Sequence, residues 1–131
     1  MLIGDYFDEV SRSIHDHQTA GFIQSSDLFT DARSDDLGYL RATLTFHDGS
    51  ELHLREYIRI SSDAIQRLAF AYHYQDQLGR LRFRYDNARH RPPLPSGAHK
   101  HVEEDVVPCE AVSPVQVIQE IVARHLAPKV G

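Results

Sequence analysis

Residues 70–87, FAYHYQDQLGRLRFRYDN, decide how this chain folds, because large apolar side chains alternate there with polar ones on both sides of a turn signal. Alternation with a period of two is typical of a β-strand that buries one face. A turn at residues 76–79 folds the two halves into a hairpin that opposes Tyr74 to Leu81, Tyr72 to Phe83 and Phe70 to Tyr85. The stretch therefore predicts an antiparallel hairpin with an aromatic face suited to packing on helices.

The opposite face of this hairpin carries His73, Arg82 and Arg84. Ala69 and Ala71 stand among these longer side chains. Two alanines there leave space above the sheet, which is what a concave phosphate-binding surface requires. The alternative interpretation is that a loop covers the two alanines.

A second hairpin precedes the first, since residues 39–46 alternate well and residues 52–60 return from the turn signal Asp48-Gly49. A three-residue loop at 48–50 aligns the apolar residues and opposes Phe46 to Leu52, Leu44 to Leu54, Ala42 to Glu56 and Leu40 to Ile58. Glu56 then lies on the apolar stripe. It is at the sheet margin, paired with an arginine, or a functional carboxylate.

Helical periodicity marks both ends of the chain. Apolar residues recur at helical spacing in residues 4–17, and Ser113-Pro114 is typical of the start of a helix that ends near Leu126. Residues 21–31 fit a strand only weakly. The sequence therefore predicts an α+β fold, an antiparallel sheet of about five strands with the N- and C-terminal helices packed on one face, in a single domain over residues 1–131.

The composition is ordinary for a soluble globular protein, with 131 residues of which 41% are hydrophobic and 25% charged. Residues 1–5 lack the features of a signal peptide, and no apolar run approaches the ~20 residues that cross a bilayer. Cys109 is the one cysteine, so no internal disulfide forms. We expect a cytoplasmic protein with no membrane partner.

Charge is distributed unevenly along the chain. Residues 80–101 hold six basic residues against Asp86 alone, a local balance of +5, whereas the rest of the chain holds 8 basic and 18 acidic residues. One basic, histidine-rich segment on an acidic body predicts a localised site for an anionic partner. The alternative is a solvated arginine strand.

Two chemistries fit the histidines of this region. His99 and His101 alternate as on one face of a strand and, with His73 and His90, offer a metal site, but no cysteine pair or metalloprotease motif supports it. Metal-free cleavage of RNA instead needs a base for the 2′-hydroxyl proton, an acid for the leaving oxygen and cations for the phosphate. Histidines, arginines and Lys100 can supply all three, so we expect no metal and no other cofactor.

Four blocks of the sequence, LREY at 54–57, YHYQD at 72–76, GRLRFRYDNA at 79–88 and HKH at 99–101, resemble the TumE family of bacterial and archaeal toxins. The resemblance covers about residues 39–126. It implies a growth-inhibiting toxin that is neutralised by an antitoxin with a helix-turn-helix domain, and RNA is the expected target. The chain departs from the family pattern at residues 89–91 and 97–98, where further histidines are expected.

Combining the residues with the resemblance gives a specific hypothesis, a toxin of a type II toxin–antitoxin system that acts as a metal-independent ribonuclease. The candidate catalytic residues are Glu56, His73, Asp86, His99 and His101. The candidate substrate-binding residues are Arg82, Arg84, Tyr85, Asn87 and Lys100. The alternatives are a non-catalytic module whose basic patch binds an antitoxin or nucleic acid, and a metal-dependent hydrolase; a homodimer is compatible with each.

Overall fold

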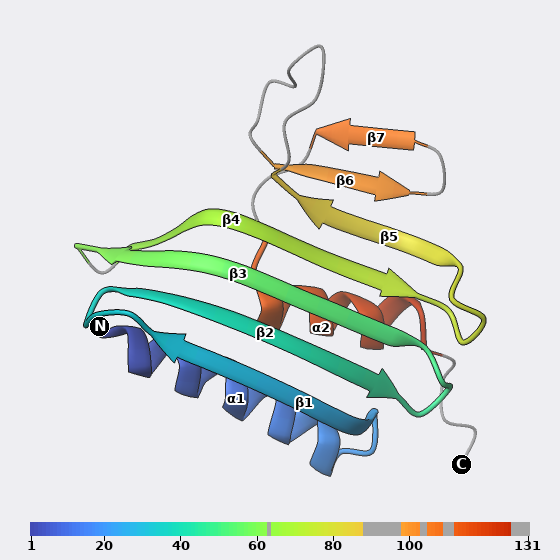
Figure 1. Ribbon diagram of the computed structural model, residues 1–131. Helices are drawn as coiled ribbons and strands as arrows, with labels where there is room; N and C mark the ends of the chain where they lie inside the picture. The colour runs from blue at the N-terminus through green and yellow to red at the C-terminus, as the bar shows by residue number, and fades with distance from the viewer. Residues whose placement is uncertain (63, 88–97, 103–104, 109–111, 127–131) are drawn as a thin grey trace.

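The computed structural model describes residues 1–62, 64–87, 98–102, 105–108 and 112–126. Helix α1 (Ile3–Thr19) precedes the strands in the sequence, and helix α2 (Pro114–Arg124) follows them. The strands are β1 (Ile23–Ala32), β2 (Leu37–Phe46), β3 (Glu51–Ser61), β4 (Ala64–Gln75), β5 (Leu81–Asp86), β6 (His99–Val102) and β7 (Asp105–Pro108). They form one seven-stranded antiparallel sheet in the order of the sequence (Figure 1).

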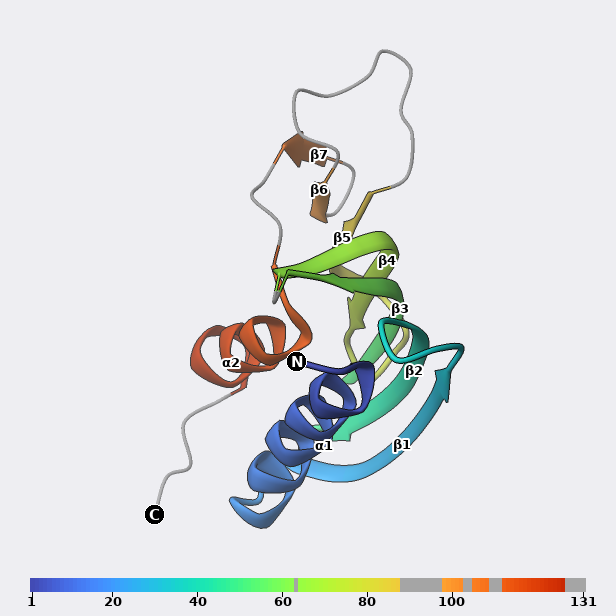
Figure 2. The same ribbon diagram turned by 90° about the vertical axis from the view of Figure 1, so that its left-hand side faces the viewer.

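Both helices pack on the same face of the sheet, as Figure 2 shows from the side. The buried residues of α1 (Ile3, Tyr6, Phe7, Val10 and Ile14) and of α2 (Pro114, Val117, Ile118 and Ile121) face the inward side chains of the strands. Ser113 caps α2 through its side chain, which accepts from the Gln116 backbone N–H, and Pro114 is the first residue of the helix. No helix among the described residues covers the other side, which we call the open face.

The predicted α+β class and the placement of both helices are confirmed, while the sheet is larger than expected. Residues 21–31 do contribute a strand, β1, and its polar composition fits an edge strand that has few buried positions. The two added strands, β6 and β7, are short and follow a proline-rich segment. Four-residue strands carry too little alternation to be recognised from sequence.

The predicted register of the first hairpin was wrong by two residues. Leu44 opposes Leu52, and Leu40, not Ala42, supplies the partner of Glu56. The loop has three residues, as predicted, but they are 47–49, because the Phe46 N–H donates to the Ser50 carbonyl oxygen. Gly49 is the third loop residue and has φ +85°, the left-handed conformation that this loop type requires at that position. A shift of two keeps every side chain on its predicted face.

The predicted register of the second hairpin was also wrong by two residues, because the loop is one residue shorter than predicted and a bulge follows it. Tyr74 opposes Phe83, Tyr72 opposes Tyr85, and the loop is residues 77–79 with Gly79 at φ +81°. A bulge between Tyr74 and Gln75 on one strand and Leu81 and Phe83 on the other accommodates one extra residue. The aromatic side chains still lie in the core, and Arg84 still lies on the open face, where it lines a cavity.

None of the helices in the described segments has the length and apolar character needed to cross a membrane.

Candidate functional site

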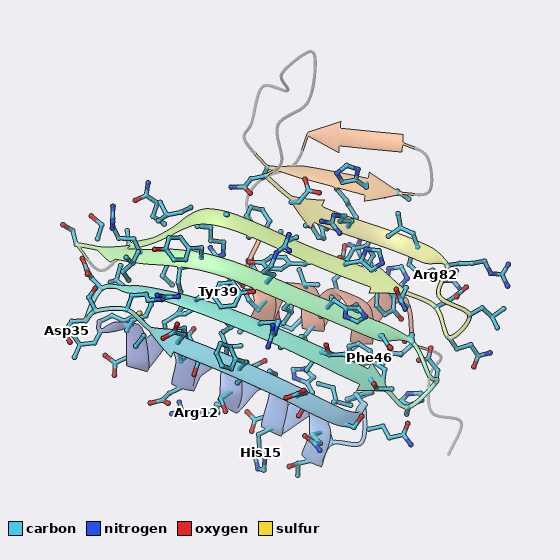
Figure 3. All side chains as sticks on the ribbon, viewed as in Figure 1. Arg12, His15, Asp35, Tyr39, Phe46 and Arg82 are labelled. Carbon is cyan, nitrogen blue, oxygen red and sulfur yellow. The ribbon has the colours of Figure 1, made fainter. Side chains whose placement is uncertain are left out.

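Two neighbouring rows of side chains cross the open face from strand to strand. Directly opposed residues on β2 to β6 form the first row, which is Thr43, His53, His73, Arg84 and His101. The second row lies two residues along β2 to β5 and is Arg41, Arg55, Ala71 and Asp86. Residues two apart on a strand share a face, so the rows lie side by side, and Figure 3 views the face that carries them.

A cavity of about 240 Å³ lies over Ala71, where the two rows meet. Its lining residues are Arg41, Ala42, Thr43, His53, Leu54, Arg55, Ala71, His73 and Arg84. Three guanidinium groups and two imidazoles border it, and the lining contains no carboxylate. Of the two alanines from which space above the sheet was predicted, Ala71 lines the cavity and Ala69 does not, and the lining favours an anion.

His73 occupies the border between the cavity and β5. Its Nε2 lies 3.2 Å from Gln75 Oε1, and its Nδ1 lies 3.5 Å from Arg84 Nη1. Because an amide oxygen can only accept, Nε2 carries the proton and Nδ1 presents its lone pair toward Arg84. Burial, and then the positive charge of Arg84, lower the pKa of His73 below the ordinary 6.5. His73 is therefore neutral at pH 7 and can accept a proton at Nδ1.

Asp86 links Arg84 to His101 beside the cavity. Its side chain is 5% exposed, and Oδ2 lies 2.9 Å from Arg84 Nε and 3.0 Å from His101 Nε2. Arg84 and His101 are also directly opposed across β5 and β6. One buried carboxylate thus lies within 3.0 Å of both a guanidinium and an imidazole beside the cavity.

Glu56 lies on the opposite side of the sheet from this cavity, fully buried beneath α1. Tyr6 of α1 and Tyr72 of β4 both donate hydroxyl hydrogen bonds to its carboxylate, and Arg67 Nε lies 2.7 Å from Oε2. Burial and the charge of Glu56 raise the pKa of both tyrosines. Of the three environments considered for Glu56, the structure shows the pairing with an arginine.

Tyr85 and Lys100 also lie on the helix-covered side. Lys100 Nζ is 3.0 Å from Glu120 Oε1 of α2 and 4.9 Å from the ring centre of Tyr85, whose hydroxyl donates to the same carboxylate. Burial lowers the pKa of Lys100, but contacts with Tyr85 and Glu120 outweigh it and the net pKa is raised. Neither residue lines the cavity formed by the described residues.

A comparison with protein families assigns the chain. The family described as Toxin TumE matches residues 11–127, which is most of the sequence. The chain belongs to the TumE toxin family. No curated protein and no solved structure matches it. The resemblance seen in the sequence blocks is thereby confirmed.

The remaining predicted site residues of this TumE chain are dispersed. The Asn87 side chain bonds to the backbone of β4, since its Oδ1 accepts from Phe70 N–H at 3.1 Å and its Nδ2 donates to the Leu68 carbonyl at 3.3 Å. Arg82 is exposed near the start of β5 (Figure 3) and lies outside the cavity lining. The backbone of His99 pairs with Asp86, but the His99 side chain, like His90 and Cys109, lies outside the described part of the chain. Within the described segments, no group of three or more potential ligands could hold a metal ion.

The sequence did not single out His53, Arg41 or Arg55, which line the cavity. The ring of His53 stands 6.1 Å from that of His73 on the neighbouring strand, and the two arginines border the cavity. The register between β3 and β4 places these three residues beside His73 and Ala71. That register could not be predicted, because the sequence between the two strands carries no recognisable turn signal.

Proposed function

We propose that this TumE protein is the toxin of a type II toxin–antitoxin pair and that it cleaves RNA without a metal ion, at the cavity over Ala71. The observation that carries the proposal is the position of a neutral histidine, His73, beside Arg84 in a cavity bordered only by cationic and uncharged side chains. Such a cavity provides both a proton acceptor and charge for a phosphate.

In the proposed reaction, Arg84, Arg41 and Arg55 bind the scissile phosphate. His73 Nδ1 accepts the proton of the adjacent 2′-hydroxyl, and the 2′-oxygen attacks phosphorus. The contact of 3.5 Å between Nδ1 and Arg84 is long for a hydrogen bond, so a substrate hydroxyl replaces it at little cost. The bond from phosphorus to the 5′-oxygen breaks, and His101, oriented by Asp86, donates a proton to that oxygen. The products are a 2′,3′-cyclic phosphate and a free 5′-hydroxyl.

This assignment moves phosphate binding from Lys100 to the arginines of the open face. Lys100 already pairs with Glu120 on the other side of the sheet. Glu56 has no role in the chemistry, since its carboxylate is enclosed by Arg67 and two tyrosines. Membership of the TumE family supports an antitoxin partner, for which a helix-turn-helix protein is the proposed form.

The proposal is tested by incubating purified protein with RNA in excess chelator and mapping the new ends. We expect cleavage with cyclic phosphate ends, and a fall of about 10²- to 10⁴-fold in rate for His73→Ala with RNA affinity largely kept. His15→Ala is the matched control, because His15 is exposed on α1 and projects away from the sheet (Figure 3).

Three outcomes would contradict the ribonuclease. Loss of cleavage in chelator that returns with a divalent ion would favour a metal-dependent hydrolase. Equal rates for His73→Ala and His15→Ala would remove the base from the mechanism. Binding of RNA without any cleavage, weakened in small steps by each arginine substitution, would favour the binding module. In cells, induced wild-type protein should arrest bacterial growth and His73→Ala should not.

A further inference from the structure

Phe29 is a large aromatic side chain held on the surface of the open face. It is 48% exposed on β1. The ring of Tyr39 meets it edge-on at 6.5 Å, and the Arg41 guanidinium lies 5.2 Å from its ring centre. These contacts fix the ring while leaving about half of it in solvent. A rigid, half-exposed ring flanked by an arginine is suited to stacking.

This aromatic surface, which we call the Phe29 platform (Phe29, Tyr39 and Arg41), is continuous with the cavity. Phe29 is directly opposed to Arg41, and Arg41 to Arg55, in the row that leads to Ala71. Arg41 belongs to both places, because it contacts the Phe29 ring and lines the cavity. A ligand whose phosphate occupies the cavity therefore has an aromatic surface beside it.

We propose that the Phe29 platform stacks an unpaired base of single-stranded RNA, adjacent to the cavity that binds the phosphate. The inference rests on the proposed function and names its substrate class. Bases of an A-form duplex are already stacked, whereas unpaired bases are free to stack on aromatic side chains and on arginine. Stacking accepts every base, so the platform selects single strands over duplexes with little preference for sequence.

The charge of the neighbouring cavity decides between this occupant and others. A second copy of the chain in a two-fold contact would bring the same arginines against themselves, because such an interface is self-complementary. An apolar protein surface would leave the cations without partners. A nucleic acid strand offers an aromatic base and an anionic phosphate in the same unit, which matches the ring and the three guanidinium groups.

The test measures binding of a fluorescent 2′-O-methyl oligonucleotide, which lacks the 2′-hydroxyl that the proposed reaction needs and so remains intact. Three probes are compared: a mixed-sequence single strand, the same backbone without bases, and the duplex. Phe29→Ala should weaken binding of the single strand about 5- to 150-fold, as expected for the loss of one stacked base. Phe29→Leu, which keeps the apolar volume but not the ring, should also weaken it. Leu78→Ala is the matched control, because Leu78 is 69% exposed at a hairpin tip away from the cavity.

The proposal is supported if the Phe29 variants bind the base-free strand as the wild type does and the duplex binds more weakly than the single strand. It is overturned if the wild type does not bind the single strand or if Phe29→Ala binds it normally. It is also overturned if Phe29→Ala weakens binding of the base-free strand as much as binding of the single strand. A wild-type dimer that Phe29→Ala dissociates would instead make the surface an interface between copies.

Failure of the two proposals can be told apart. Cleavage that depends on His73 but not on Phe29 leaves the ribonuclease and removes the platform. Base-dependent binding through Phe29 with no cleavage by the wild type leaves the platform and removes the ribonuclease. Where both hold, Phe29→Ala should raise KM more than it lowers kcat.

Discussion

Two arginine–carboxylate pairs lie on opposite faces of the same sheet, and they differ in what surrounds them. On the helix-covered face, Glu56 and Arg67 are 0% and 14% exposed, and two tyrosine hydroxyls complete the coordination of the carboxylate. On the open face, Asp86 and Arg84 are 5% and 35% exposed, and a histidine and a cavity adjoin them. The same kind of ion pair is enclosed on one face and accessible to solvent on the other. Its surroundings, and not the identity of the two charged groups, therefore decide whether it can contact a ligand.

Glu56→Ala is expected to have the largest effect, a loss of folding stability. Removal of this carboxylate leaves the Arg67 charge without its counter-ion and takes from the Tyr6 and Tyr72 hydroxyls the acceptor that they share, which costs about 3–5 kcal/mol of unfolding free energy. Urea denaturation measures it. Asp31→Ala is the control, because the Asp31–Arg33 pair is 39% and 62% exposed and should contribute little. Equal losses for the two variants would mean that the buried pair contributes no more to stability than an exposed one.

The second largest effect is expected on catalysis, from substitution of Asp86 in the accessible pair. Asp86→Asn should lower kcat for RNA cleavage about 10- to 100-fold, the usual cost of losing a carboxylate that orients a catalytic group, here through its contact with His101. RNA affinity should change little, and the loss of stability should be smaller than for Glu56→Ala, because Arg84 can turn to solvent. A stability loss as large as that of Glu56→Ala, with cleavage per folded molecule unchanged, would make Asp86 structural.

A smaller effect concerns the pH dependence of cleavage. Burial and Arg84 together lower the pKa of His73, so the acid limb of the kcat/KM profile lies below pH 6.5 in the wild type. Arg84→Gln removes the positive charge, which makes protonation of His73 less unfavourable and moves the acid limb to higher pH. Burial is the larger cause and remains, so the limb stays below the ordinary value. Arg82→Gln on the same strand should leave the acid limb in place. An equal shift for both variants would mean that the net charge of the protein, and not the contact with Arg84, sets the pKa of His73.

Much of this comparison could be predicted from sequence, because alternation assigns faces even when the register is wrong. Both hairpins were misaligned by two residues, yet His73 and Arg84 were correctly placed opposite the aromatic face. The partner of Glu56 could not be named, since it depends on a bulge. Tyr57 pairs with Ala69 but Ile58 pairs with Arg67, so Leu68 is the extra residue that turns Arg67 toward the core.

The location of Lys100 illustrates the other limit. Its side depends on pairing with Tyr85 across β5 and β6, and a strand of four residues gives no periodic signal. Proximity in sequence to His101 suggested a shared site. Neighbouring residues on a strand point to opposite faces, however, so the side chains of Lys100 and His101 lie on opposite sides of the sheet.

The smallest effect is therefore expected for Lys100→Ala. Its ion pair with Glu120 is 22% and 16% exposed, and its contacts with the Phe83 and Tyr85 rings add to the packing of α2. We expect a loss of about 1 kcal/mol of unfolding free energy and unchanged cleavage of RNA. Arg84→Ala, measured in parallel, should lose cleavage because its charge borders the cavity. A large fall in cleavage for Lys100→Ala at unchanged stability would return this lysine to the phosphate site, and would mean that the two faces cooperate in binding RNA.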